Sequence, residues 1–236
     1  MLNVTNVSLR FGGIHAIQDI SFEAKTGQVL GLIGPNGAGK TSLFNCVTGY
    51  YRPTSGTVML DGENITGRRP YQISRRGMRR TFQNIRLFGD LSVHANIVAG
   101  GHVLKLSEAE LSRRCYELCD ELQIDEAFLA RRSGDLPYGI QRRVELARAL
   151  IAEPKILLVD EPGAGLNGAE RQLIVGILRD VVRTGGLGVI LIEHDIGMIA
   201  RACDHVVVLD RGRLLSEGTP DQIRNDPAVI SAYLGT

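Results

Sequence analysis

Residues 34–41 read Gly34-Pro35-Asn36-Gly37-Ala38-Gly39-Lys40-Thr41, and this stretch sets the class of fold. It fits the pattern G-x-x-x-x-G-K-[ST], a loop whose backbone N–H groups surround nucleotide phosphates. The apolar run 29–33 before it predicts a buried strand, and residues 42–47 after it predict the start of a helix. Strand, glycine loop and helix N-terminus together predict an anion site.

Most positions of this loop have an expected role. The three glycines allow close approach and unusual φ angles, as a phosphate cradle requires. Lys40 can place its ammonium on the β- and γ-phosphates, and the Thr41 hydroxyl can ligate Mg²⁺. The alternative, a glycine-rich turn before a helix, leaves the fixed positions and both flanks unexplained. The other candidate nucleotide-binding residues of the loop and the first helical turn are Pro35, Asn36, Ala38 and Ser42.

A second apolar segment, residues 155–161, ends in the carboxylates Asp160 and Glu161. In a parallel sheet, ligands sit beyond the carboxyl ends of the strands, so both carboxylates are expected at the edge that carries the phosphate loop. Asp160 suits Mg²⁺, and Glu161 can orient an attacking water or take its proton. The alternative is a pair of carboxylates that cap a turn before Pro162. The phosphate loop earlier in the chain favours the functional interpretation.

Two further residues are candidates by position. His194 follows the apolar strand 188–193, so it is expected beside the γ-phosphate, although a lone histidine is usually structural. Phe11 precedes the phosphate loop in the turn 11–13. From the residues alone, Phe11 either stacks on a nucleotide base or merely packs at that turn.

The remaining pattern predicts an α/β fold with a helical insert. Segments 4–9 and 17–22 alternate as half-buried strands, and Asp61-Gly62 is expected to turn a hairpin. Residues 84–153 have helical periodicity, with a capping box at Ser107 and Glu110. Its last helix, about 136–152, is expected to carry Pro137 at the first helical position. Arg142, Arg143 and Arg148 are expected largely off its apolar face, and Thr219-Pro220 is expected to start a final helix.

Composition limits the classes of function. The 236 residues suit one large domain or one domain with a subdomain, and a net charge of +1 gives no general case for nucleic-acid binding. The cluster Arg75, Arg76, Arg79 and Arg80 is expected to be a solvated face. Cys115 and Cys119 share a helical face with leucines and are expected to be buried thiols. No apolar run approaches the roughly 18 residues that span a bilayer, so any membrane role is expected to go through a partner.

The order of these motifs resembles the ATP-binding subunits of ABC transporters, over essentially the whole chain. The resemblance implies a P-loop NTPase core of that type, with an N-terminal antiparallel β subdomain and the helical subdomain 84–153, in one domain 1–236. It implies that Phe11 stacks on adenine, and that Gln83 touches Mg²⁺ or the attacking water while its loop contacts a membrane subunit. The matching segments, in order, are Phe11, Gly34–Thr41, Gln83, Leu136–Gln141, Ile156–Glu161, Gly163–Asn167 and His194.

Some segments resemble one branch, the ATPases of branched-chain amino acid importers. They are Arg80–Phe88, Tyr138-Gly139, Ile192–Asp195 and Ala232–Gly235. Importers for urea, amides or aromatic acids share most of this pattern. Lipid or lipopolysaccharide exporters and soluble ABC ATPases outside transport are further alternatives.

The signature 136–140 departs from the usual pattern, because Pro137 replaces its serine, and Asn167 stands where aspartate is usual. We therefore expect pairing with a non-identical ATPase.

The resemblance implies a complex in which two ATPase subunits enclose two ATP molecules. Lys40 and the loop then bind phosphates, while Thr41, Gln83 and Asp160 serve Mg²⁺. Glu161 activates water, His194 positions the γ-phosphate, and Tyr138 and Gly139 face the neighbouring nucleotide. The expected partners are two membrane permease subunits and, indirectly, a periplasmic or extracellular solute-binding protein, with no nucleic acid. The expected location is peripheral, on the cytoplasmic face of the inner (plasma) membrane.

Overall fold

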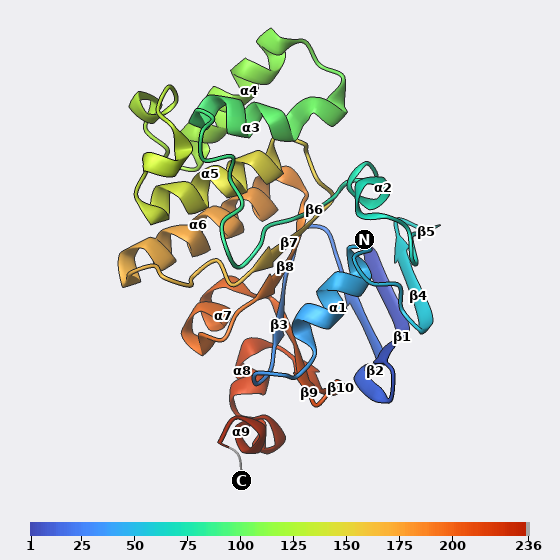
Figure 1. Ribbon diagram of the computed structural model, residues 1–236. Coiled ribbons are helices and arrows are strands. Elements are labelled where there is room, and N and C mark those ends of the chain that lie inside the picture. Colours follow the sequence, from blue (N-terminus) through green and yellow to red (C-terminus); the bar gives the residue numbers. More distant parts are fainter. Residues whose placement is uncertain (235–236) are drawn as a thin grey trace.

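Two β-sheets form the frame of the protein, seen here in a computed structural model that describes residues 1–234 (Figure 1). Gly235, part of the C-terminal segment singled out above, lies outside the described residues. The first sheet has the order β2-β1-β4-β5 and the second has the order β10-β9-β3-β8-β7-β6. The strands are β1 Leu2–Phe11, β2 Ile14–Ala24, β3 Val29–Ile33, β4 Ser55–Leu60, β5 Glu63–Asn64, β6 Met78–Arg80, β7 Ile156–Asp160, β8 Gly188–Ile192, β9 His205–Asp210 and β10 Arg213–Gly218.

The helices gather in groups around these sheets. In Figure 1, α3, α4 and α5 lie together at one end of the molecule, while α8 and α9 lie at the opposite end. The α-helices are α1 Lys40–Val47, α2 Pro70–Ser74, α3 Val93–Gly101, α4 Glu108–Glu121, α5 Tyr138–Leu150, α6 Gly168–Gly185, α7 Ile196–Ala202, α8 Pro220–Arg224 and α9 Pro227–Leu234; short 3₁₀ turns are His102–Leu104, Glu126–Phe128 and Ser133–Asp135.

The second sheet places the candidate site. Strands β6, β7, β8, β3 and β9 run parallel, so their carboxyl ends meet at one edge. Successive side chains of a strand point to opposite faces, and these central strands are buried on both. In β3, Leu30 and Leu32 therefore join the core beneath the first sheet, while Val29 and Ile33 join the core beneath the helices. The phosphate loop and the end of β7 consequently emerge at the same edge.

The first sheet is antiparallel and packs against α1. Val58 of β4 and Val4 of β1 are paired in register, and both are buried in the core that also contains Leu43 and Phe44 of α1. Helix α1 is thus fixed by apolar contacts on the side away from its polar residues. This packing holds the phosphate loop, which leads directly into α1.

The architecture confirms the predicted α/β fold class. The predicted strand 29–33 has the expected bounds, Asp61-Gly62 joins β4 to β5, and Ser107 and Glu110 form the capping box of α4. Phe11 is different, because it ends strand β1 instead of lying in the turn. The bounds 84–153 for a helical subdomain stay a prediction. Between them, the described residues form helices and one isolated bridge, Ser92 to Arg132.

Three expectations about helices were wrong. Pro137 is the N-cap of α5 instead of its first helical residue, because its ψ of 145°, at a φ of −54°, is extended and not helical. Thr219-Pro220 does start a helix, but α9 follows it, because Asn225 ends α8 after five residues. Arg142 is buried instead of facing away from the core. Among the described residues, no helix is long and apolar enough to span a membrane.

Candidate active site

The phosphate loop joins the buried end of β3 to the start of α1. Its geometry needs glycine at two positions where the loop meets neighbouring backbone. A Cβ on Gly34 would lie 2.1 Å from the carbonyl oxygen of Leu209, and one on Gly39 would lie 2.8 Å from that of Ala16. Gly39 also has a φ of 102°, a left-handed conformation that favours glycine. The loop is therefore pressed between β9 and β2, as a cradle of fixed shape requires.

Lys40 is held within this loop. Its Nζ donates to the carbonyl oxygens of Gly34 at 2.7 Å and Pro35 at 3.0 Å. Burial lowers the pKa of Lys40, while the nearby charges of Glu161 and Asp160 raise it in part. Lys40 therefore interacts electrostatically with both Asp160, the last residue of β7, and Glu161, which follows it. Thr41 is exposed and Ser42 half-buried in the first turn of α1, where helix N–H groups and small side chains can meet an anion.

Asp160 ends β7 and is paired with Arg80 of the neighbouring strand β6. Arg80 Nη2 donates to Asp160 Oδ2 at 2.8 Å, and both side chains are more than nine-tenths buried. Arg80 Nη1 donates to Asn45 Oδ1 of α1 at 2.7 Å. The guanidinium also lies 5.1 Å from the centre of the Phe82 ring. This buried arginine therefore ties the end of β7 to α1 and to the segment before Gln83.

Glu161 lies at the centre of the candidate catalytic group. Gln83 Nε2 donates to Glu161 Oε2 at 2.9 Å, and His194 Nδ1 lies 3.8 Å from the same oxygen. Glu161 has a φ of 45°, a conformation that L-residues with long side chains rarely adopt. Its N–H donates to the carbonyl oxygen of Ile192 at 2.9 Å, which holds that backbone against β8. The sequence-predicted residues Gln83, Glu161 and His194 thus converge from three separate segments.

Glu193 is a buried residue that contacts the backbone on both sides of this group. Its buried carboxylate accepts from the N–H of Gly163 at 2.8 Å and from that of His194 at 3.2 Å. Burial raises the pKa of Glu193, and the hydrogen bond from Gly163 opposes that rise. Glu193 therefore fixes the backbone of His194 relative to the segment that follows Glu161.

Phe11, Tyr138 and Gly139 lie apart from this group. Phe11 is 49% exposed, and its ring centre is 5.2 Å from that of Tyr51, at the end of the hairpin whose Ala16 borders Gly39. Tyr138 and Gly139 form the first turn of α5, and a Cβ on Gly139 would lie 2.4 Å from Glu170 Oε1. In the described part of the chain, no hydrogen bond, ion pair or ring contact joins residues 138–139 to residues 34–42.

Sequence reasoning missed three charged residues: Arg80, Arg142 and Glu193. Arg80 was expected on a solvated face, and that was wrong, because the charge of Asp160 pairs with it inside the protein. Arg142 likewise pairs with Glu145 on the next turn of α5. The spacing of Arg142 and Glu145, three residues apart on one helix, was the available signal for that pair.

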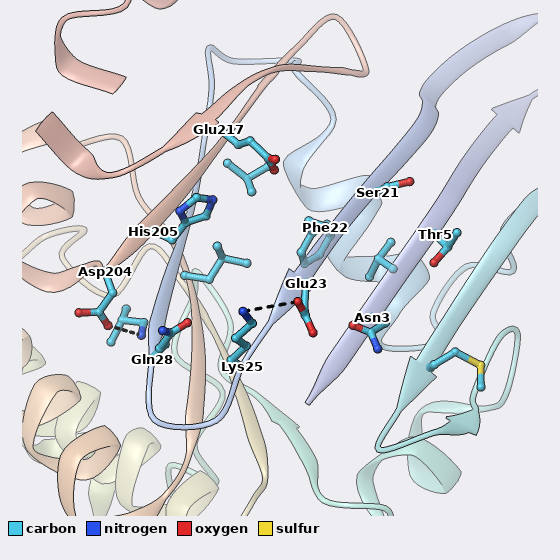
Figure 2. Close-up of a pocket in the computed structure, with 15 residues that line it drawn as sticks. Asn3, Thr5, Ser21, Phe22, Glu23, Lys25, Gln28, Asp204, His205 and Glu217 are labelled. Atoms are coloured by element: carbon cyan, nitrogen blue, oxygen red, sulfur yellow. Dashed lines mark hydrogen bonds and ion pairs between the residues drawn. The ribbon is translucent and has the colours of Figure 1, made fainter. Parts of the chain in front are cut away.

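A cavity of about 760 Å³ opens elsewhere, between the edges of the two sheets (Figure 2). Gln28 and Val29 line it at the amino end of β3, the end opposite the phosphate loop. Its wall includes an ion pair of 3.7 Å between Lys25 and Glu23, and the Val29 N–H donates to Asp204 Oδ2 at 2.8 Å. The cavity is therefore distinct from the group around Glu161.

Comparison with known families and relatives agrees with this geometry. Residues 17–164 match the family model described as ABC transporter, and residues 213–236 match the model described as branched-chain amino acid ATP-binding cassette transporter. The chain is 40% identical to the high-affinity branched-chain amino acid transport ATP-binding protein BraF of Pseudomonas aeruginosa, covering 100% of this chain and 98% of the relative. It is 37% identical to LivG of Escherichia coli K12, a protein of the same description, with the same coverage.

Solved structures show the same fold. An ATP-binding cassette of an ABC transporter, in its ADP conformation, superposes with a TM-score of 0.89 at 26% identity, covering 100% of this chain and 99% of that one. CbiO1 from Clostridium perfringens, part of the ABC transporter complex cbiONQ, superposes with a TM-score of 0.87 at 30% identity, covering 97% and 92%.

Proposed function

This chain belongs to the ABC transporter ATPase family, and we propose that it is the ATP-hydrolysing subunit of an importer of branched-chain amino acids. The convergence of Gln83 and His194 on Glu161, beside the phosphate loop, is the observation that carries the hydrolytic part of this proposal. The match of residues 213–236, together with relatives similar over the full chain, supports the substrate class. That match favours this class over urea, amide or aromatic-acid importers and over lipid exporters.

The loop residues 34–42 are the proposed phosphate site. Its backbone N–H groups, the positive end of α1 and Lys40 together offer an anion several donors and a cation. Lys40 can release the two loop carbonyls that it now contacts and turn its ammonium to the phosphates. The exposed Phe11, on the hairpin that borders Gly39, is the proposed stacking surface for adenine.

The residues present fit a magnesium ion. Thr41, Gln83 and Asp160 supply hydroxyl, amide and carboxylate oxygens, the ligand type that Mg²⁺ prefers. One oxygen of Asp160 pairs with Arg80, which leaves Oδ1 available. No group of three or more His, Cys, Asp or Glu side chains gathers as a metal site among residues 1–234, in keeping with an ion that retains waters and phosphate oxygens. When bound, Mg²⁺ neutralises charge on the β- and γ-phosphates.

Glu161 is the proposed residue that orients the attacking water and accepts its proton. Phosphoryl transfer needs chiefly positioning and charge stabilisation. Gln83 donates to Glu161 Oε2, and His194 lies near the same oxygen; contact with the γ-phosphate is the proposed role of His194. Glu193 accepts a hydrogen bond from the His194 backbone, which supports the proposal that His194 has a fixed position in the site.

The proposed complex contains two permease subunits, a solute-binding protein that acts through them, and a second, non-identical ATPase. Tyr138 and Gly139 make no contact with this chain's own phosphate loop within the described residues, so a neighbouring subunit's nucleotide is their proposed ligand. Pro137 has no hydroxyl or N–H for that nucleotide, which supports unequal ATP sites. The proposed location is the cytoplasmic face of the membrane that holds the permeases.

Reconstitution into proteoliposomes tests this function. The chain is assembled with two permeases, a loaded binding protein and a second ATPase, and leucine uptake and ATP hydrolysis are measured. A matched complex carries Glu161→Gln, which retains the size and hydrogen-bonding reach of the side chain but not its basicity. We expect hydrolysis and uptake to fall at least about 100-fold with ATP binding retained, as for removal of a general base.

Three outcomes would contradict parts of the proposal. Absence of ATP-driven leucine uptake by the wild-type complex would reject the substrate class. Unchanged hydrolysis with Glu161→Gln would reject the assignment of Glu161. Hydrolysis by the purified chain alone at the rate of the full complex would reject pairing with a non-identical ATPase.

A further inference from the structure

A buried ion pair on helix α5 faces the loop that carries Gln83. Arg142 is 0% exposed and Glu145 is 2% exposed, and Arg142 Nη1 donates to Glu145 Oε2 at 2.9 Å. A buried ion pair gives little net stability, because desolvation offsets its attraction. Net stability therefore does not explain why this pair is buried. The other hydrogen bonds of the two side chains suggest that the pair has a positioning role.

The pair holds the backbone of residues 82–87. Arg142 Nη1 donates to the carbonyl oxygen of Phe82 at 2.8 Å, and Nη2 donates to that of Gln83 at 2.7 Å. Glu145 Oε1 accepts from the N–H of Arg86 at 3.2 Å. Within the described chain, residues 82–87 make no backbone–backbone hydrogen bond. The course of this loop is thus set by two side chains from α5.

Arg142 also contacts the first residue of α5, one helical turn before it. Arg142 Nη2 also donates to Tyr138 Oη at 3.0 Å. One guanidinium therefore touches both the carbonyl of Gln83, whose amide holds Glu161, and the aromatic residue of the signature at the start of α5. Arginine suits this position because its planar fork donates in several fixed directions at once.

We propose that Arg142 and Glu145 form a clamp that makes the 82–87 loop and the first turn of α5 move as one unit, so that Arg142 is a positioning residue for Gln83 and Tyr138. This role rests on the proposed function, in which Gln83 serves the chain's own ATP site and Tyr138 serves the neighbouring one. A change at either site is then transmitted to the other through one buried side chain. Among the described residues, neither Arg142 nor Glu145 makes a hydrogen bond or ion pair with the phosphate loop, so the clamp acts on turnover and not on ATP affinity.

Amide hydrogen exchange on the full chain tests the clamp directly. The variant Arg142→Met/Glu145→Leu removes both charges and keeps an apolar filling, a replacement that buried ion pairs often tolerate. The Arg86 amide, which donates to Glu145, reports on the clamp, and we expect it to exchange at least about fivefold faster than in the wild type, the effect of losing one hydrogen bond. The Phe88 amide, which donates to Asn96 Oδ1 at 2.9 Å, is an internal control and should be unchanged.

Two further variants separate positioning from folding. Arg143→Met is the matched control, because Arg143 is the next residue of α5 but donates to the carbonyls of Leu122 and Gln123 instead. Arg142→Lys keeps the charge that pairs with Glu145 but lacks the fork. It should give intermediate exchange at the Arg86 amide, and it keeps the test decisive if the double variant fails to fold.

The assembled transporter gives the functional measurement. A misplacement of about 1 Å at a catalytic group can lower the rate about 100-fold, so we expect kcat to fall at least about tenfold in the double variant. The KM for ATP should stay within about twofold, because residues 34–42 are untouched. Arg143→Met should leave both constants near their wild-type values.

The clamp is refuted if exchange of the Arg86 amide stays within about twofold of the wild type in the double variant, because the loss of its hydrogen bond to Glu145 should change the rate more than that. It is also refuted if Arg143→Met loosens the same loop equally, or if KM rises while kcat is unchanged. A wild-type complex without ATP-driven uptake would reject the proposed function instead. The exchange comparison would still decide whether the clamp holds the loop.

Discussion

Replacement of Arg80 by methionine should destabilise the protein through a charge left alone at Asp160. Arg80 and Asp160 are paired at 2.8 Å, with side chains 8% and 9% exposed, so water reaches neither end of the pair freely. The variant also removes the hydrogen bond from Arg80 Nη1 to Asn45. Methionine fills most of the same space, so the loss is chiefly electrostatic.

The magnitude follows from this burial. Breaking a buried ion pair by removing one partner costs about 3–5 kcal/mol of unfolding free energy. Asp160 lies at the edge of the candidate active site, where water can partly solvate its carboxylate once Arg80 is gone. We therefore expect a loss at the lower end of this range, about 3 kcal/mol. For a domain of this size, that corresponds to a fall in Tm of about 6–12 °C.

Urea and thermal unfolding followed by circular dichroism provide the measurement, since the chain contains no tryptophan. Arg79→Met is the matched control, because Arg79 lies on the same strand but makes no ion pair among the described residues. Adding Asp160→Asn to Arg80→Met should recover part of the loss, because the isolated charge is gone. A loss below about 1 kcal/mol, or no recovery in the double variant, would refute the reasoning.

Two other predictions concern the backbone around the site. Burial raises the pKa of Glu193 above its ordinary 4.5, so the folded state binds that proton more tightly and stability falls as pH rises through the raised value. Glu193→Gln should therefore be more stable than the wild type in urea at about pH 8. The advantage should vanish near pH 4.5, and an advantage that grows on acidification would contradict it. Gly39→Ala places a Cβ 2.8 Å from the Ala16 carbonyl at a φ of 102°, so ATP affinity should fall at least about tenfold in a fluorescent-nucleotide titration. Gly37→Ala, whose Cβ meets open space, should cost less affinity, and an equal loss would show that crowding at Gly39 is unimportant.

Periodicity and spacing predicted the parts of the protein that depend on local pattern. The strand Val29–Ile33, the loop after it and the carboxylates at the end of β7 all follow from apolar runs and fixed motif positions. The convergence of Glu161 and His194 follows from parallel strands that share an edge.

The buried arginines could not be predicted in the same way. A periodicity argument treats arginine as polar and places it on the surface. Arg80 is enclosed because it donates to the side chains of Asp160 and Asn45. Arg142 is enclosed because the Glu145 carboxylate and two backbone carbonyls of the 82–87 loop accept from it. Those partners come from segments up to 80 residues away in the chain. Only the folded arrangement brings them together.

The way in which the 82–87 loop is held also bears on how such a subunit can change over evolution. Among the described residues, the hydrogen bonds that Arg142 and Glu145 make with the loop all go to main-chain atoms, which every amino acid provides. Residues such as Asn84 and Ile85 can therefore be exchanged without breaking these hydrogen bonds, so the surface proposed to contact the membrane subunit can change while the loop stays held. Main-chain atoms hold the loop, whereas its side chains form the proposed contact with a partner. A lineage can therefore acquire a new partner by substitutions that leave the hydrolytic residues unchanged.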